Sequence, residues 1–195
     1  MNLFSVALIL FLIMDPIGNI SSYLSLVKTL PPARQRWVLL REMLIALSAI
    51  LLFNFVGEFI FHVLELNDVT LQMAAGVILF FTACKILFVT KDNPRANLPV
   101  GEPFVIPLAI PLIAGPSLLA TVMLYAHLEP SIPLMLGSIF AAWGAATLVL
   151  FFANQIKKIL GNNGLIACER IMGIVLILLA IQRIGEGIQL FVKGL

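Results

Sequence analysis

The chain has 195 residues, of which 61% are hydrophobic and 11% are charged, and its mean hydropathy is +1.09. Soluble domains contain about 45–50% apolar and about 25% charged residues, so this composition excludes an ordinary soluble domain. The net charge of +2 is close to neutral and the basic residues lie in short connections, which argues against a nucleic-acid partner. The composition therefore predicts an all-α, polytopic membrane protein whose surroundings are the lipid bilayer.

Six apolar runs follow one another along the chain, and each is long enough for a membrane-crossing helix of about 20 residues. Prolines and a basic stretch ending at Arg41 separate the first two runs, and Gly161 to Gly164 is the predicted turn before the last. Little sequence remains for anything else, so residues 1–195 are predicted to be a single integral membrane domain. The predicted spans are 3–27, 42–63, 69–90, 103–126, 133–155 and 168–192.

The basic residues are concentrated in three of the connections between the predicted spans. Ten of the twelve Lys and Arg residues follow the first span, follow the third span or surround the turn before the sixth. By the positive-inside rule these three connections face the cytoplasm. Both termini are then predicted on the outer, periplasmic side.

Asp15-Pro16 interrupts the first apolar run in its middle. A carboxylate is costly in hydrocarbon and proline removes a helix hydrogen bond, so the pair predicts a break in the helix at membrane depth. Gly115-Pro116 stands at the corresponding place in the fourth run, one hundred residues later. Pro107 and Pro111, one helical turn apart, are expected to weaken the first half of that span.

The two halves of the chain align as an internal repeat, about 1–90 and about 103–195. Pro16 matches Pro116 at an offset of 100, and Gly76 matches Gly173 at an offset of 97. Three spans are an odd number, so the second repeat must enter the membrane from the opposite face. At 1.5 Å per residue, each break lies about 20 Å from the end where its span begins, and the two approach the midplane from opposite sides.

Two segments resemble the signature segments of the MarC family of bacterial inner-membrane proteins: Met14 to Asn19 in the first span and Pro107 to Pro116 in the fourth. The similarity extends to the last span, from Arg170 to Gln182. This resemblance implies six helices, a location in the bacterial inner membrane and a distant relation to LysE-type amino-acid exporters.

Paired interrupted spans are the best indication in a sequence of a transporter binding site. The exposed start of a half-helix suits an anionic group, and unpaired carbonyls suit a cation. The alternative is that the prolines only bend two packed helices. The residues expected to line a solute or ion site are Asp15, Pro16, Gly18, Asn19, Pro107, Pro111, Gly115, Pro116 and Ser117.

Asp15 has two compatible interpretations. It either binds a cation, a proton or a substrate ammonium, or it caps the half-helix that begins at Pro16. Arg183 likewise either pairs with Glu186 three residues on, or serves as a counter-charge for Asp15 or a ligand for an anion.

Asn54, the other secondary candidate, begins a polar row with Glu58 and His62 on the second span. This row is interpreted as a polar helix interface, because two ligands do not make a metal site. Neither a metal nor a cofactor is therefore predicted.

The leading functional hypothesis is a secondary transporter or exporter of a small polar solute, with amino-acid-like solutes among the candidates. The sequence has no Walker A loop, so a coupling ion or proton is expected to supply the energy. A structural or regulatory membrane protein without transport activity is the alternative. A channel is less favoured, and an enzyme is not expected because no nucleophile–base pair or metal motif is found. The oligomeric state is left open.

Overall fold

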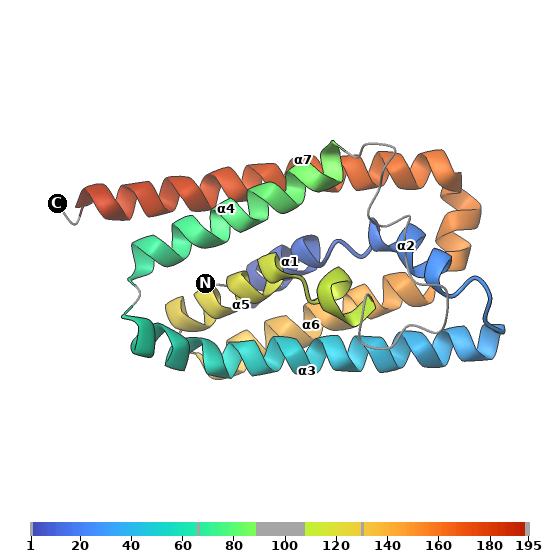
Figure 1. Cartoon of the computed structure of the whole chain (residues 1–195), viewed down its shortest axis with the longest axis horizontal. Coiled ribbons are helices and arrows are strands. Elements are labelled where there is room, and N and C mark those ends of the chain that lie inside the picture. Colours follow the sequence, from blue (N-terminus) through green and yellow to red (C-terminus); the bar gives the residue numbers. More distant parts are fainter. Residues whose placement is uncertain (1, 66, 89–107, 130, 194–195) are drawn as a thin grey trace.

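The computed structural model describes residues 2–65, 67–88, 108–129 and 131–193, and all regular structure in these ranges is helical (Figure 1). Among these residues, four helices are long and apolar enough to cross a membrane, and the number is five if the bent pair α1 and α2 is counted as one span. The elements in chain order are α1 (Leu3–Met14), α2 (Asn19–Leu26), α3 (Pro32–Leu64), α4 (Asp68–Leu87), the π-helical turn η2 (Leu108–Ile113), α5 (Pro116–Leu128), α6 (Ile132–Phe151) and α7 (Ala153–Lys193).

The basic stretch after the first span is helical, which corrects the prediction of a separating loop. Helix α3 begins at Pro32, ten residues before the predicted start of the second span. Proline fits the first turn of a helix, where its missing N–H is not needed, and neither glycine nor proline follows before Gly57. The guanidinium carbons of Arg34 and Arg41 lie 4.7 and 4.9 Å from the ring centre of Trp37. These contacts hold the charged side chains along the exposed surface of the helix.

The turn predicted at Gly161 to Gly164 is a single-residue kink. Gly161 has φ 67° and ψ −179°, and the residues on both sides of it are helical within α7. That combination is open essentially to glycine alone. Residues 153–160 therefore form a short helical segment of their own, which changes direction before the long final part of α7 (Figure 1).

Helices α4 and α7 lie side by side along one edge of the bundle and run in opposite directions (Figure 1). Close approach depends on glycine: a Cβ added at Gly76 would lie 2.7 Å from Ile184 Cγ1. Beside this pair, α1 packs on α6 and α5 packs on α3. Large apolar side chains point outward, including Phe4, Phe59 and Ile159, which are 74%, 68% and 82% exposed. An apolar outer surface of this kind is suited to lipid.

One end of the bundle gathers the start of α1, the end of α7, the α3–α4 turn and the α5–α6 turn (Figure 1). Asp68 Oδ1 and His127 Nε2 lie 3.0 Å apart and link the two turns. The hydroxyl of Ser138 donates to the carbonyl oxygen of Leu3 at 3.1 Å. The opposite end holds the α2–α3 corner and the first segment of α7.

Candidate functional site: two helix breaks in contact

The predicted break in the first span is present. Helix α1 ends at Met14, and Asp15 adopts a left-handed conformation with φ 44° and ψ 57°. The axis of α2 is bent by 52° from that of α1. Because an L-residue in this conformation cannot continue a helix, the break is built into the backbone at Asp15.

The Asp15 side chain is buried, with 4% of its surface exposed. Its Oδ1 accepts a hydrogen bond from the backbone N–H of Gly18 at 3.1 Å. The carboxylate lies directly over Gly18, where an added Cβ would be 2.2 Å from Oδ2. Asp15 thus caps the turn that leads into α2, and Gly18 provides the space for it. The half-helix that Asp15 was expected to cap begins at Asn19 and not at Pro16. A role of Asp15 in binding stays a prediction.

The second break lies between η2 and α5. Inside η2, Ile110 has extended angles, φ −131° and ψ 126°, and the N–H of Ala114 donates to the carbonyl of Ala109 at 2.8 Å across a widened turn. Gly115 then caps α5, which begins at Pro116. The expected distortion of this half-span is therefore confirmed in its described part. Pro107 and the side chain of Pro111 lie outside the described residues.

Asn19 joins the two breaks. Its side-chain Nδ2 donates to the carbonyl oxygen of Met14 at 2.9 Å and to that of Leu112 at 3.2 Å. The first acceptor belongs to the break at Asp15, and the second lies just before the break at Gly115. The residue is 2% exposed, and its Oδ1 has no hydrogen-bond partner among the described residues. The structure therefore places Asn19 against the second break, whereas Asp15 and Gly18 contact each other within the first.

A row of buried polar side chains leads away from the second break along α5. Ser117, Thr121 and Tyr125 recur every four residues and are 3%, 4% and 0% exposed. The Thr121 hydroxyl donates to the carbonyl of Ser117 at 2.8 Å, and the Tyr125 hydroxyl accepts from Arg183 Nη2. Gly115 is half-buried and Pro116 is exposed, so the buried polar face of α5 begins at Ser117.

The two secondary candidates lie apart from the breaks. Arg183 Nη1 donates to Glu186 Oε2 at 2.7 Å, which confirms the pairing predicted from their spacing. Its described partners are Glu186 and Tyr125. Asn54 is buried in α3, and its Oδ1 has no hydrogen-bond partner within the described ranges. The side chains of Glu58 and His62 are not among those described.

The family model described as "MarC family integral membrane protein" matches residues 1–192. The chain belongs to the MarC family. It is 40% identical to the UPF0056 inner membrane protein YhgN of Escherichia coli (strain K12) over 195 residues, 99% of each chain. A UPF0056 membrane protein of Buchnera aphidicola subsp. Schizaphis graminum is 41% identical over 99% of each chain. One from Chlamydia muridarum is 30% identical, over 92% of this chain and 89% of its own. No solved structure matches.

These relatives support the expected location of this MarC protein in the inner membrane, as a multi-pass protein. The name of the Escherichia coli protein states that membrane, and the apolar helices α3, α4, α6 and α7 are long enough to cross it.

One buried charge was missed in the sequence of this MarC chain. Glu42 in α3 is 0% exposed, and its Oε1 accepts from Arg41 Nε and Nη2 at 3.0 and 2.8 Å. Its Oε2 has no hydrogen-bond partner in the described part of the chain. The signal was available, because the buried residues Val38, Leu39 and Ala46 lie three or four residues from Glu42 and place it on the same face of the helix.

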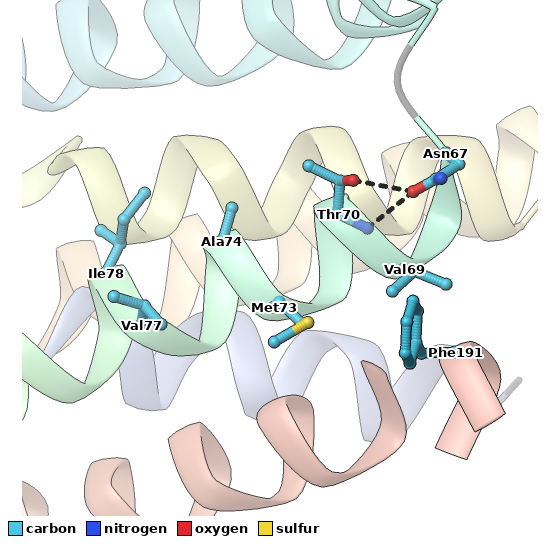
Figure 2. Close-up of a pocket in the computed structure, with 8 residues that line it drawn as sticks. All are labelled: Asn67, Val69, Thr70, Met73, Ala74, Val77, Ile78 and Phe191. Carbon is cyan, nitrogen blue, oxygen red and sulfur yellow. Dashed lines mark hydrogen bonds between the residues drawn. The ribbon is translucent and has the colours of Figure 1, made fainter. Parts of the chain in front are cut away.

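Two cavities of this MarC structure lie near the ends of the bundle. Figure 2 shows the first, of about 600 Å³, where Phe191 of α7 faces the start of α4 and Asn67 accepts hydrogen bonds from Thr70. Its other lining residues are Val69, Met73, Ala74, Val77 and Ile78, so this groove is mainly apolar. The second, of about 610 Å³, lies at the opposite end and reaches Ser21, two residues beyond Asn19.

Proposed function

We propose that this MarC protein is a secondary transporter that moves a small polar solute across the bacterial inner membrane. The solute would bind where the two helix breaks meet, and an ion or proton gradient would drive it. The position of Asn19 carries the proposal: one buried amide holds carbonyls of both breaks, and its own Oδ1 has no hydrogen-bond partner among the described residues. A buried polar atom without a partner costs free energy, and such atoms are retained where a ligand or water meets them.

The breaks offer complementary chemistry. Asp15 brings a carboxylate to the start of α2, and Ser117 brings a hydroxyl to the first turn of α5. A half-helix start attracts a carboxylate group, whereas a buried aspartate attracts an ammonium group. A small zwitterion, such as an amino acid, satisfies both.

Reciprocal contacts support an inverted repeat of three spans in each half. Under the offset of 97, Gly76 corresponds to Gly173 and Leu87 corresponds to Ile184. An added Cβ at Gly76 would meet Ile184 Cγ1 at 2.7 Å, and one at Gly173 would meet Leu87 Cβ at 3.6 Å. Under the offset of 100, α1 corresponds to the region of η2, and the contact of α1 with α6 is matched by the contact of η2 with α3. Such exchange is what a pseudo-twofold axis between the halves requires.

Polar side chains continue from the breaks toward both ends of the bundle. The first route follows the buried side chains of Ser117, Thr121 and Tyr125 along α5. The second route is the cavity lined by Ser21 and Lys28. With the positive-inside rule, the second route faces the cytoplasm and the first the periplasm, so both termini are periplasmic. The proposal assigns the breaks to transport and not to an enzymatic reaction.

Transport in reconstituted vesicles tests this function. Purified protein in proteoliposomes is given labelled amino acids and other small zwitterions under imposed proton, sodium and potential gradients. We expect gradient-dependent accumulation by the wild type and by the control Ser48→Ala, whose exposed hydroxyl bonds only its own helix. Asn19→Ala is expected to reduce the rate at least about tenfold, the effect of losing about 1.4 kcal/mol.

Asp15→Asn separates the coupling role from binding, because it keeps an oxygen acceptor for Gly18 and removes the charge. If Asp15 carries the coupling ion or proton, solute exchange without a gradient persists while gradient-driven accumulation is lost. No accumulation above empty vesicles for any solute under any gradient, with folded wild-type protein, would overturn the proposed function.

A further inference from the structure

The cavity at the basic end of the bundle is polar and charged, unlike the apolar groove in Figure 2. It has a volume of about 610 Å³ and lies between α2, the α2–α3 corner and the first segment of α7. Its lining residues are Ser21, Leu24, Ser25, Val27, Lys28, Gln35, Asn154 and Lys157.

Every polar side chain that lines this cavity carries a hydrogen-bond donor. Lys28 and Lys157 bring two ammonium groups, and Ser21, Ser25 and Asn154 add hydroxyl and amide donors. The described lining residues include no carboxylate, and no salt bridge joins either lysine to a described residue. Two cations beside neutral donors suit a ligand that is anionic and only accepts hydrogen bonds, which is the chemistry of phosphate.

The backbone that carries Lys28 is held in place. The side-chain Nε2 of Gln35 donates to the carbonyl oxygens of Val27 and Leu30, at 3.2 and 2.8 Å. The Tyr23 hydroxyl donates to the carbonyl oxygen of Gln35 at 3.2 Å. These three bonds tie the end of α2 to the start of α3, so the cavity is framed by a fixed corner of the chain.

The opposite wall is placed by the kink at Gly161. The short helical segment 153–160 ends there, and it carries Asn154 and Lys157 on the cavity side. Ile159 on the same segment is 82% exposed. A short helix with a lysine on one side and an exposed isoleucine on the other is typical of a segment that lies in the membrane interface. Phosphate groups of phospholipids are concentrated at that depth.

We propose that this cavity binds a phosphate group through Lys28 and Lys157. The interfacial segment points to an anionic phospholipid headgroup as its source, and a soluble phosphate anion is the other source with the same chemistry. The site does not depend on transport, because it requires only the two lysines and the fixed corner around them.

Binding of lipids to the purified full chain in detergent tests the site. The probes are short-chain phosphatidylglycerol, short-chain phosphatidylcholine and inorganic phosphate. The test variant is Lys28→Gln/Lys157→Gln. The matched control is Lys158→Gln/Arg170→Gln, which removes the same charge from two exposed residues outside the cavity lining. Thermal unfolding of each variant confirms that it is folded.

Phosphatidylglycerol is expected to bind more tightly than phosphatidylcholine. The test variant is expected to bind phosphatidylglycerol about 25-fold more weakly, since each of its two lysines contributes about fivefold. The control variant should bind as the wild type does. Binding of inorganic phosphate alone, lost in the test variant, would support the site with a soluble anion as its ligand. Test and control variants that bind every probe equally would overturn the proposal, because the lysines would then act only as general surface charge.

Discussion

The side-chain amide of Asn19 lies 3.2 Å from the carbonyl oxygen of Leu112, 93 residues away in the chain. The same amide donates to the carbonyl of Met14, so one buried side chain ties the end of α1 to the distorted turn η2. The two breaks consequently form one structural unit. Any movement of one break relative to the other must alter the hydrogen bond from Asn19 to Leu112.

Replacement of Asn19 should loosen this unit. Asn19→Ala removes both hydrogen bonds that the side chain donates. A hydrogen bond between membrane helices contributes about 0.6 to 1.7 kcal/mol, so we expect a loss of about 1–2 kcal/mol in the free energy of unfolding. Equilibrium unfolding in mixed micelles measures this loss. Ser48→Ala is the control, since the Ser48 hydroxyl is exposed and bonds within α3. An Asn19→Ala variant as stable as the control would show that the amide does not hold the breaks together.

Gly18 should tolerate no side chain while Asp15 is present. A Cβ at this position would lie 2.2 Å from Asp15 Oδ2, so Gly18→Ala is expected to destabilise the fold by about 1–3 kcal/mol, as overpacking does. In Asp15→Gly/Gly18→Ala the carboxylate is gone and the left-handed backbone is preserved. The double variant should then be more stable than the sum of the single effects predicts. Additive effects would contradict the contact, and Gly144→Ala, with open space around its Cβ, is the control.

The antiparallel contact of α4 and α7 predicts an order among glycine substitutions. A Cβ at Gly76 would meet backbone and side-chain atoms of α7 at 2.7 to 3.0 Å, one at Gly173 would meet Ile86 at 3.1 Å, and one at Gly185 would meet nothing within 4 Å. Gly76→Ala should therefore cost most, about 1–3 kcal/mol, Gly173→Ala less, and Gly185→Ala nothing. Thermal unfolding of the three variants measures the order. Equal effects of Gly76→Ala and Gly185→Ala would show that this helix pair is not packed as described.

The effects of substituting Glu42 and Arg41 on the free energy of unfolding should depend on each other. Breaking a buried pair by removing one partner leaves an uncompensated charge, and Arg41→Gln is expected to cost up to about 3 kcal/mol because Arg41 is itself 19% exposed. Arg41→Gln/Glu42→Gln should regain most of that loss. Arg34→Gln is the matched control, since Arg34 also stacks on Trp37. A double variant less stable than Arg41→Gln would contradict the dependence.

The breaks were predictable because they follow from local chemistry. Asp15-Pro16 and Gly115-Pro116 interrupt a helix wherever they stand in an apolar run, and the distortion at Ile110 follows from the neighbouring prolines. The Asn19 bridge was not predictable in the same way, because its acceptor belongs to a segment that only the folded chain brings near. Asn19 itself was a candidate, but its role as the joint between the breaks required the tertiary structure.

The other differences between the sequence-based predictions and the structure also have specific physical causes. Charge in the stretch ending at Arg41 suggested a loop, although long arginine side chains can lie along the exposed surface of a helix that begins at Pro32. Starting the second span at residue 42 also hid the buried face that contains Glu42. At the last turn, several small and polar residues suggested a loop, whereas the change in direction needs only the backbone freedom of Gly161.

Accessibility of the second break tests the central claim most directly. In a Cys84→Ser/Cys168→Ser background, Ser117→Cys and the neighbouring control Leu118→Cys are treated with a membrane-impermeant maleimide in sealed vesicles of each orientation. Both positions are buried, at 3% and 1% exposed, but only Ser117 lies on the polar face that leads to Tyr125. If the breaks form a solute site, Ser117→Cys reacts from an aqueous side and Leu118→Cys does not. If Ser117→Cys is as inert as Leu118→Cys from both sides, the breaks are packed solid and the transport account is contradicted.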